Sequence, residues 1–257
     1  MNILVTICAR AGSKGVVSKN TRDFLGYPIC LYALSALDIF VDRYGSGYGD
    51  FCLAVNSDSP KLYQQIDAVN FEYIKTERKE SLAGDVASKI DVIRDTLAQA
   101  ESIAGRAFDI VVDLDLTSPL RRAVDIKNVI DTLDGTPGAE VALSVTGARR
   151  NPYFNQLIKK ESGFYGTVVD SDFVARQQAP EIFDVNAAAY AYRADFLRNS
   201  DTMIIKAKIA VSYMEDTAVL DIDNEHDYEM LQVIADYYYK NKPEFGEIRE
   251  RILDSGQ

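Results

Sequence analysis

Histidine is nearly absent from this chain, whose 257 residues contain only one, His226. A single histidine cannot build a metal site with several histidine ligands. His226 lies at the start of an expected helix, so we interpret it as structural rather than as the base of a Ser-His pair. Cysteine is almost as scarce, and Cys8, Cys30 and Cys52 lie in apolar runs without a C-x-x-C pair. We therefore expect buried, reduced thiols and a cytoplasmic protein.

Positive charge is also in deficit, because 28 Lys and Arg residues face 39 Asp and Glu residues, a net charge of −11. A basic face for nucleic acid or for an anionic membrane is therefore not expected. An anionic substrate stays possible, since a few local cations can form a positive pocket. Long apolar runs are missing too. The apolar run at 3–8 is too short to span a membrane and lacks the flanks of a signal peptide, so we expect a first strand there.

Strand and helix patterns alternate along most of the chain. The β-branched run at 3–8 is typical of a strand buried on both faces, as in a parallel sheet. Further strands are expected at 51–55, 71–74, 108–114, 140–145, 187–192 and 209–213. Helices are expected at 28–40, 60–67, 85–100 and 123–133, and a last one after the N-cap Asn224. This order predicts an α/β fold with a doubly wound, mostly parallel sheet.

The alternation stops between residues 149 and 186, a stretch rich in aromatic and polar residues. We interpret 1–148 and 187–257 as one nucleotide-binding α/β domain and 149–186 as an excursion that serves dimerisation and the sugar side. Ligands of doubly wound sheets bind at the carboxyl ends of the strands. Polar residues do follow the expected strands, at 10–15, 56–58 and 115–121.

The strongest local signal is the segment ARAGSKGVVSKN after the first strand. Gly12 and Gly15 permit tight turns and close approach of the backbone to a ligand, and backbone N–H groups of such loops bind anions. Arg10, Lys14 and Lys19 add charge-assisted bonds to phosphate. Neither a Walker motif nor G-x-G-x-x-G is present, so a P-loop NTPase and a dinucleotide oxidoreductase are disfavoured. A solvated polar turn is the alternative interpretation.

A pair of carboxylates follows the apolar residues Val219 and Leu220. On a strand, Asp221 and Asp223 would share one face. There they could bind Mg²⁺, which takes one or two carboxylates together with substrate phosphates. The alternative is a strand end in which Asp223 helps to cap the next helix.

Two further polar segments are candidates for ligand binding. In the first, DLDLTSPLR, Thr117 and Ser118 can cap a turn or bond a ligand, and Arg121 can pair with an anion or brace the loop. The second, RQQAP, begins at Arg176 and is followed by Asn186 and Tyr190; it combines a guanidinium with amide and phenol donors. A structural turn and a solvated edge are the respective alternatives.

Four motifs in order, ARAGSKGVVSKN, LTSPLR, RQQAP with NAAAY, and LDIDNEHDY, resemble the acylneuraminate cytidylyltransferase family, the CMP-sialic acid synthetases. The details ICARAGSKG, DLDLTSPLR and RNPYFN are most similar to its bacterial CMP-legionaminic acid synthetase branch. The resemblance implies a homodimer with a Rossmann-like nucleotide domain and a small swapped dimerisation lobe. It also implies CTP and an acidic nine-carbon sugar as substrates and Mg²⁺ as cofactor.

The resemblance assigns site residues by position. The nucleotide side comprises Ala9, Arg10, Ala11, Gly12, Ser13, Lys14, Lys19, Asn20, Arg78, Asp85 and Ser88. The sugar side comprises Asp115, Thr117, Ser118, Arg121, Arg176, Gln177, Asn186 and Tyr190. The metal pair is Asp221 and Asp223, and with Arg10 and Lys19 this pair carries the catalytic roles.

Two positions depart from the family pattern. Asp115 stands where sialic acid enzymes have a Gln that contacts the sugar, and Ala187 stands where they have Gly. A carboxylate only accepts hydrogen bonds, so we expect a related sugar with different nitrogen substituents. The predicted reaction transfers CMP from CTP to the anomeric hydroxyl of a nonulosonic acid and releases pyrophosphate. A CMP-Kdo type enzyme and a catalytically silent nucleotide-binding regulator are the alternatives.

Overall fold

The computed structural model describes residues 1–12, 15–84, 87–215 and 222–255. Seven strands form the central sheet: β1 (Asn2–Cys8), β4 (Asp50–Ser57), β5 (Ile74–Glu77), β6 (Ile110–Leu114), β7 (Val141–Gly147), β10 (Phe183–Arg193) and β11 (Ile209–Tyr213). The helices are α1 (Ile29–Tyr44), α2 (Pro60–Asp67), α3 (Lys89–Ala104), α4 (Ala123–Gly135), α5 (Ala194–Asn199), α6 (Glu225–Asn241) and α7 (Pro243–Ser255). A short hairpin of β2 (Asp23–Phe24) and β3 (Tyr27–Pro28) precedes α1.

The sheet is mostly parallel and doubly wound, as the sequence predicts. Its strand order is β11-β7-β10-β6-β1-β4-β5, and β10 runs antiparallel to both of its neighbours. The chain leaves β1 toward β4 and β5 and then returns to place β6 on the other side of β1. The point where the winding reverses therefore lies between β1 and β6, which is where such sheets bind ligands.

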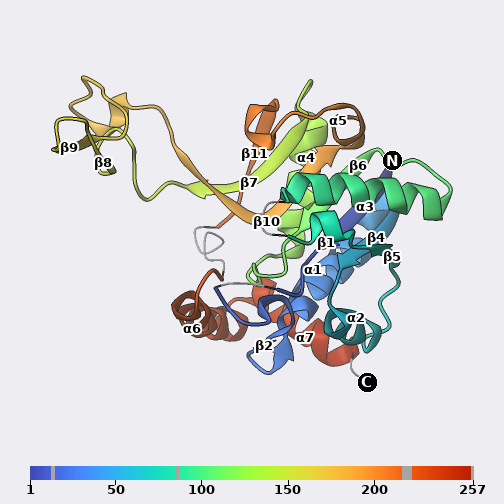
Figure 1. Cartoon of the computed structure of the whole chain (residues 1–257). Coiled ribbons are helices and arrows are strands. Elements are labelled where there is room, and N and C mark those ends of the chain that lie inside the picture. The colour runs from blue at the N-terminus through green and yellow to red at the C-terminus, as the bar shows by residue number, and fades with distance from the viewer. Residues whose placement is uncertain (13–14, 85–86, 216–221, 256–257) are drawn as a thin grey trace.

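Helices cover both faces of this sheet (Figure 1). Along β1, Ile3, Val5 and Ile7 join the core cluster on the face of α1, α2 and α4, while Leu4 joins the cluster on the face of α3 and α5. Because successive strand residues point to opposite faces, one buried strand supplies both cores. Helices α6 and α7 extend the first of these layers, and α7 packs against α1. In the part of the chain that the structure describes, no helix is long and apolar enough to cross a bilayer.

The excursion projects away from the sheet, carried by the long strands β7 and β10 (Figure 1). It contains a two-stranded hairpin, β8 (Leu157–Lys159) and β9 (Tyr165–Thr167), and a 3₁₀ turn at Arg176–Gln178. Strand β10 already begins at Phe183, which pairs with Gly147 of β7. The sheet thus resumes four residues before the domain boundary predicted at residue 187, because β10 pairs with β7 from Phe183 onward.

Most predicted elements are present, with shifts at their ends. Helix α2 and strand β11 have their predicted bounds, and the Asn224 side chain accepts from the Asp227 backbone N–H as the N-cap of α6. The third predicted strand was placed at 71–74, whereas β5 runs from Ile74 to Glu77. The helix predicted at 85–100 begins only at Lys89, because the Ser88 hydroxyl caps it. Helix α7 was not predicted.

Candidate active site

A polar cleft of about 310 Å³ opens at the carboxyl ends of β1 and β6. Its lining includes Arg10, Lys19, Asn20, Arg78, Lys89 and Asp115. The fold brings these six residues together from four separate segments, and five of them were predicted from the sequence as ligand-binding residues. The sixth, Lys89, is a residue that the sequence reasoning missed.

The loop after β1 is held in place by several backbone contacts. Ala9 donates its N–H to the Asn56 carbonyl, and Ala11 donates its N–H to the Asp58 carboxylate at 2.6 Å. The Asn20 amide donates to the Arg10 carbonyl at 3.0 Å and so closes the loop on itself. Gly12 lies exposed at the turn. A fixed loop that carries Arg10 and Lys19 suits a polyphosphate, because the cations need not be ordered when the ligand binds.

The same loop is fastened to the start of α6. The Lys19 ammonium lies 3.3 Å from the Asp223 carboxylate, whose side chain is 74% exposed. Arg22 forms a two-pronged ion pair with Glu225 in the first turn of α6. The loop that lines the cleft is therefore held against the start of α6, although the two segments are separated by about 200 residues of sequence.

Arg78 reaches the cleft from the end of β5. Its Nε donates to the Leu82 carbonyl at 3.0 Å, and its Nη1 donates to the Asn56 side-chain oxygen at 3.3 Å. Asn56 is completely buried at the end of β4 and also donates to the Glu77 carbonyl. Asn56 therefore orients Arg78, and the guanidinium keeps donors for an anion.

A charged cluster forms the β6 side of the cleft. The Lys89 ammonium lies 2.8 Å from Asp113 and 2.9 Å from Asp115. Burial alone would lower the pKa of Lys89, but the charges of Asp113 and Asp115 raise this pKa well above its ordinary value. Burial opposes the ionised form of Asp115, yet the Lys89 ammonium and the hydrogen bonds from Thr117 hold the pKa of Asp115 well below its usual range. Lys89 and Asp115 are therefore both charged at neutral pH.

The one thiol in the cleft does not supply a nucleophile. Burial, aided by the charge of Asp113, raises the pKa of Cys8 to about 12. The thiolate, which is the reactive form, is therefore scarce at neutral pH. The sulfur lies 3.6 Å from the Thr96 hydroxyl, so Cys8 serves packing, as the sequence predicts.

Several residues that the sequence predicts to bind substrate are enclosed by the fold. Thr117 and Ser118 are buried, and Thr117 donates both its backbone N–H and its hydroxyl to Asp115. Arg121 is 1% exposed, and its Nη1 donates to the carbonyls of Asp115 and Ala188. Burial lowers the pKa of Arg121 to about 10. Arg121 therefore braces the loop, which was one of the two roles considered for it, and these three side chains do not reach the cleft surface.

Two further predicted sugar residues lie in β10. Asn186 is 4% exposed, and its side-chain oxygen accepts from the Ser144 hydroxyl and the Ala188 backbone N–H. It stabilises the irregularity in the β10–β7 pairing between Val185 and Tyr190. Tyr190 is half-buried against the core layer beside α3. The structure thus assigns Asn186 to the sheet rather than to a ligand.

The remaining predicted residues either lie away from the cleft or are not among the residues that the structure describes. Ser88 exchanges hydrogen bonds with Asp91 as the N-cap of α3 and is not a cleft residue. Arg176 and Gln177 are exposed on the excursion. Ser13, Lys14, Asp85 and Asp221 lie outside the described residues.

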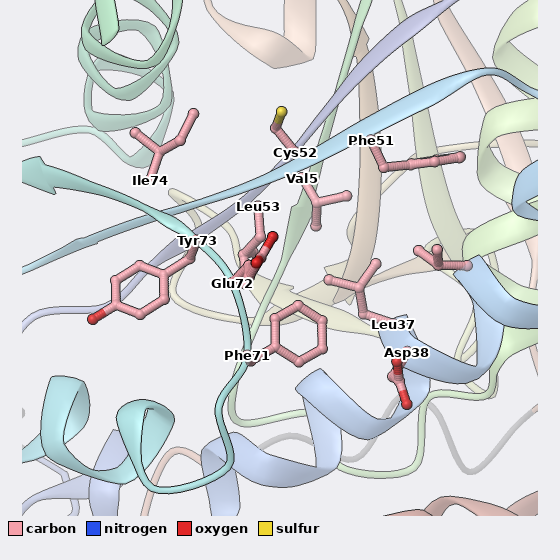
Figure 2. Close-up of a pocket in the computed structure, with 11 residues that line it drawn as sticks. Val5, Leu37, Asp38, Phe51, Cys52, Leu53, Phe71, Glu72, Tyr73 and Ile74 are labelled. Carbon is pink, nitrogen blue, oxygen red and sulfur yellow. The ribbon is translucent and has the colours of Figure 1, made fainter. Parts of the chain in front are cut away.

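A second cavity, of about 630 Å³, is mostly apolar, with Asp38 and Glu72 also in its lining, and lies between α1 and the strands β4 and β5 (Figure 2). Leu37 of α1 faces Phe51, Leu53 and Phe71 there. No lysine or arginine is among the described residues that line it, so it offers no counter-charge to a phosphate. The polar cleft is therefore the candidate active site.

Two relatives are similar to this chain over nearly its whole length. One is the post-translational flagellin modification protein B of Campylobacter coli, 31% identical over 236 residues, which cover 90% of this chain and 94% of the relative. The other is the CMP-N,N'-diacetyllegionaminic acid synthase of Campylobacter jejuni, 30% identical over 233 residues, with 90% and 94% covered. The chain belongs to the acylneuraminate cytidylyltransferase family.

The fold of this cytidylyltransferase family member is shared with more distant proteins. A solved CMP-2-keto-3-deoxy-manno-octonic acid synthetase in complex with CTP superimposes with a TM-score of 0.63 at 17% identity, covering 91% of this chain and 98% of that one. At this identity the likeness shows the fold alone. No family model matches the chain.

The sequence reasoning missed Lys89 because the ion-pair partners of this residue lie far from it in the sequence. In the sequence of this cytidylyltransferase family member it stands at the start of a helix, where a lysine is usually solvated. Only the return of the chain to β6 places Asp113 and Asp115 beside it. The D-x-D pattern in DLDLTSPLR, which puts two carboxylates on one face of a strand, was the available hint that a cation is nearby.

Proposed function

We propose that this protein transfers CMP from CTP to the anomeric hydroxyl of a nonulosonic acid of the legionaminic or sialic acid type. The carrying observation is that the predicted loop cations Arg10 and Lys19, with Arg78, meet in one cleft in a chain of this family. Three cations in one cleft of a strongly acidic protein indicate an anionic ligand, and the C. jejuni relative's name supplies the class of reaction.

The reaction requires an in-line displacement at the α-phosphorus. The anomeric oxygen of the sugar forms a bond to this phosphorus while the bond to the bridging oxygen of pyrophosphate breaks. The electron pair of that bond leaves with pyrophosphate, and the hydroxyl proton passes to solvent or to the leaving group. No covalent enzyme intermediate is needed, so positioning and charge stabilisation carry the catalysis.

The chain's own residues divide these tasks. Arg10 neutralises charge at the α-phosphate, and Lys19 with the loop N–H groups holds the departing pyrophosphate. Arg78, oriented by Asn56, binds the nucleotide from the β5 side. On the sugar side of the cleft, Lys89 pairs with both Asp113 and Asp115 and so compensates part of their negative charge.

The donor set suits Mg²⁺ at the rim of the cleft. Asp223 is an exposed carboxylate beside Lys19, and carboxylate and phosphate oxygens are the ligands that Mg²⁺ prefers. No group of three or more metal-binding side chains occurs within the described residues, so phosphate oxygens and water would complete the coordination. When bound, the ion would neutralise phosphate charge. We propose Asp223, with Asp221, as the residues that hold it.

We also propose a homodimer that assembles through the excursion, and a cytoplasmic location. Large apolar side chains are exposed on the excursion: Leu157, Ile158, Phe164, Tyr165, Val168 and Val174. A cluster of this kind is typical of an interaction surface. Arg176 and Gln177 lie on the same excursion, and we propose that they contact the sugar across this interface. The three free thiols accord with a reducing compartment.

The test is a panel that measures pyrophosphate release. CTP, ATP, GTP and UTP are each combined with N,N'-diacetyllegionaminic acid, N-acetylneuraminic acid and Kdo. We expect turnover with CTP and a nonulosonic acid to exceed every other combination. Preference for Kdo would favour the CMP-Kdo type, and binding of CTP without turnover would favour a silent regulator; either result contradicts the proposal.

A further inference from the structure

The cluster around Lys89 is built from charges that compensate one another. Lys89 contacts Asp113 and Asp115, while Arg121 lies behind the loop and donates to the Asp115 carbonyl. Thr6 of β1 donates its hydroxyl to the other oxygen of Asp113 at 2.9 Å. Two carboxylates and two cations thus fix the junction of β1 and β6, the point where the winding of the sheet reverses.

Within this cluster, Lys89 has the side chain that is most exposed to solvent. The side chain of Lys89 is 37% exposed, against 25% for Asp115 and 1% for Asp113. One oxygen of Asp115 accepts two hydrogen bonds from Thr117, and the other accepts from Lys89. An ammonium has three N–H donors, and the described residues supply Lys89 with two acceptors. On this side of the cleft, the group available to a ligand is therefore the N–H donor of Lys89 rather than the Asp115 carboxylate.

The position of the cluster separates it from the phosphate-binding cations. Arg10 and Lys19 follow β1 and Arg78 follows β5, whereas Asp115 follows β6 on the opposite flank of β1. Beyond β6 lies β10, which leads to the excursion (Figure 1). With both substrates in the cleft, the polyphosphate of the nucleotide would lie on the first flank and the second substrate on the other flank.

The charges around Lys89 also favour an uncharged hydrogen-bond partner over an anionic one. Two carboxylates already lie within 2.9 Å of the Lys89 ammonium. A third anionic oxygen on the same ammonium would lie close to both and be repelled by them. An uncharged acceptor, such as an N-acyl carbonyl or a hydroxyl oxygen, receives the hydrogen bond without this cost.

We infer that Lys89 is a specificity-determining residue that donates a hydrogen bond to an uncharged oxygen of the acceptor sugar, and that Asp113 and Asp115 hold its ammonium in place. The inference rests on the proposed function. It replaces the expectation that the Asp115 carboxylate reads the sugar directly, because that carboxylate is committed to Lys89 and Thr117. Lys89 touches the sugar, whereas its two carboxylate partners act only by positioning it.

The test compares Lys89→Met with wild type in initial-rate measurements that vary CTP and N,N'-diacetyllegionaminic acid separately. We expect the KM for the sugar to rise about ten- to a hundredfold, the range for a lost hydrogen bond to a charged group. The KM for CTP should change less than about threefold, since Arg10, Lys19 and Arg78 are intact. Lys79→Met is the matched control, because Lys79 pairs with Asp95 of α3 outside the cleft; it should leave both constants unchanged.

A second pair of variants covers loss of folding. If Lys89→Met unfolds because Asp113 becomes an uncompensated buried charge, Asp113→Asn is compared with Asp113→Asn/Lys89→Met, and the same rise in sugar KM is expected between them. An unchanged sugar KM, or a rise in the KM for CTP instead, overturns the inference while wild-type turnover upholds the proposed function. Absence of wild-type turnover with CTP and any nonulosonic acid refutes the proposed function, and the inference falls with it.

Discussion

A Cβ atom on Gly15 would lie 1.8 Å from the backbone carbonyl oxygen of Asp223. Such a distance is impossible between real atoms, so the loop after β1 can approach the start of α6 only because residue 15 lacks a side chain. Lys19 fastens the same two segments from the other side through its ion pair with Asp223. The proposed phosphate-binding loop and the proposed metal ligand are thus positioned by these two contacts.

Replacement of Gly15 by Ala should force the loop and the α6 start apart. We expect the melting temperature to fall by several degrees, since a clash with backbone cannot be relieved by rotating a side chain, and the Kd for CTP to rise about tenfold or more. Differential scanning calorimetry and isothermal titration calorimetry measure the two effects.

Gly12→Ala is the matched control for folding, because nothing lies within 4 Å of a Cβ placed on Gly12. Its melting temperature should equal that of wild type. Equal melting temperatures for the two alanine variants would refute the claim that the contact between Gly15 and Asp223 sets the loop position.

Asp223→Asn should remove most of the activity and leave the fold intact. The side chain is exposed, so its loss costs little stability, whereas a weakened Mg²⁺ site should lower kcat/KM about a hundredfold. Steady-state rates over a Mg²⁺ titration, with thermal melts alongside, provide the measurement.

Glu225→Gln serves as its control, because Glu225 also joins the start of α6 to the loop, through Arg22. If Glu225→Gln loses as much activity as Asp223→Asn at every Mg²⁺ concentration, the carboxylate of Asp223 acts as a loop anchor and not as a metal ligand.

The sequence predicted the sheet and the loop cations because both depend on local patterns. An apolar β-branched run identifies β1, and the glycines and cations that follow it identify the loop. Side-chain roles that depend on distant segments were not predictable in this way. Arg121 and Asn186 have the residue types of ligand-binding groups, but only the fold shows that each is enclosed and bonded to the backbone of Ala188.

Lys89 illustrates the opposite error. Its neighbours Asp85 and Ser88 were assigned to the nucleotide side, but nothing local marked Lys89 itself, and only β6 brings two carboxylates to it. Asp115 lines the cleft, but its ion-pair partner Lys89 lies 26 residues away in the sequence. An ion pair between residues of two distant segments cannot be predicted from the sequence of one segment alone.

The ion pair of Asp115 gives stability a defined pH dependence. Because the folded pKa of Asp115 lies below its ordinary value, its contribution is present above the unfolded pKa of about 4 and is lost as the pH falls toward the folded pKa. Asp115→Asn should therefore be less stable than wild type by about 1–3 kcal/mol between pH 5 and pH 8. This difference should shrink below about pH 4.

Urea unfolding of both proteins across this pH range measures the difference. A gap that widens on acidification would mean that the Asp115 carboxylate is destabilising when ionised, contrary to the geometry of its bonds to Lys89 and Thr117.

The exposed apolar side chains of the excursion predict the assembly state. Phe164 and Val174 are 78% and 88% exposed. Phe164→Glu/Val174→Glu should convert a dimer into a monomer at micromolar concentration, because charges at the centre of an apolar interface are strongly unfavourable. Size-exclusion chromatography with light scattering gives the mass directly.

Val233→Glu is the control for this experiment, because Val233 is 74% exposed on α6, away from the excursion. It should remain dimeric. A wild-type protein that is monomeric, or a dimer that persists in the excursion variant, would place the interface elsewhere or remove it.

The central claim is the formation of a CMP-sugar, which ³¹P nuclear magnetic resonance detects directly. CTP, N,N'-diacetyllegionaminic acid, Mg²⁺ and the protein are mixed and followed with time. The account predicts that the three phosphorus resonances of CTP decay while one phosphodiester resonance and pyrophosphate grow in equal molar amounts. Persistence of CTP, or its conversion to free CMP and pyrophosphate without a phosphodiester, would contradict it.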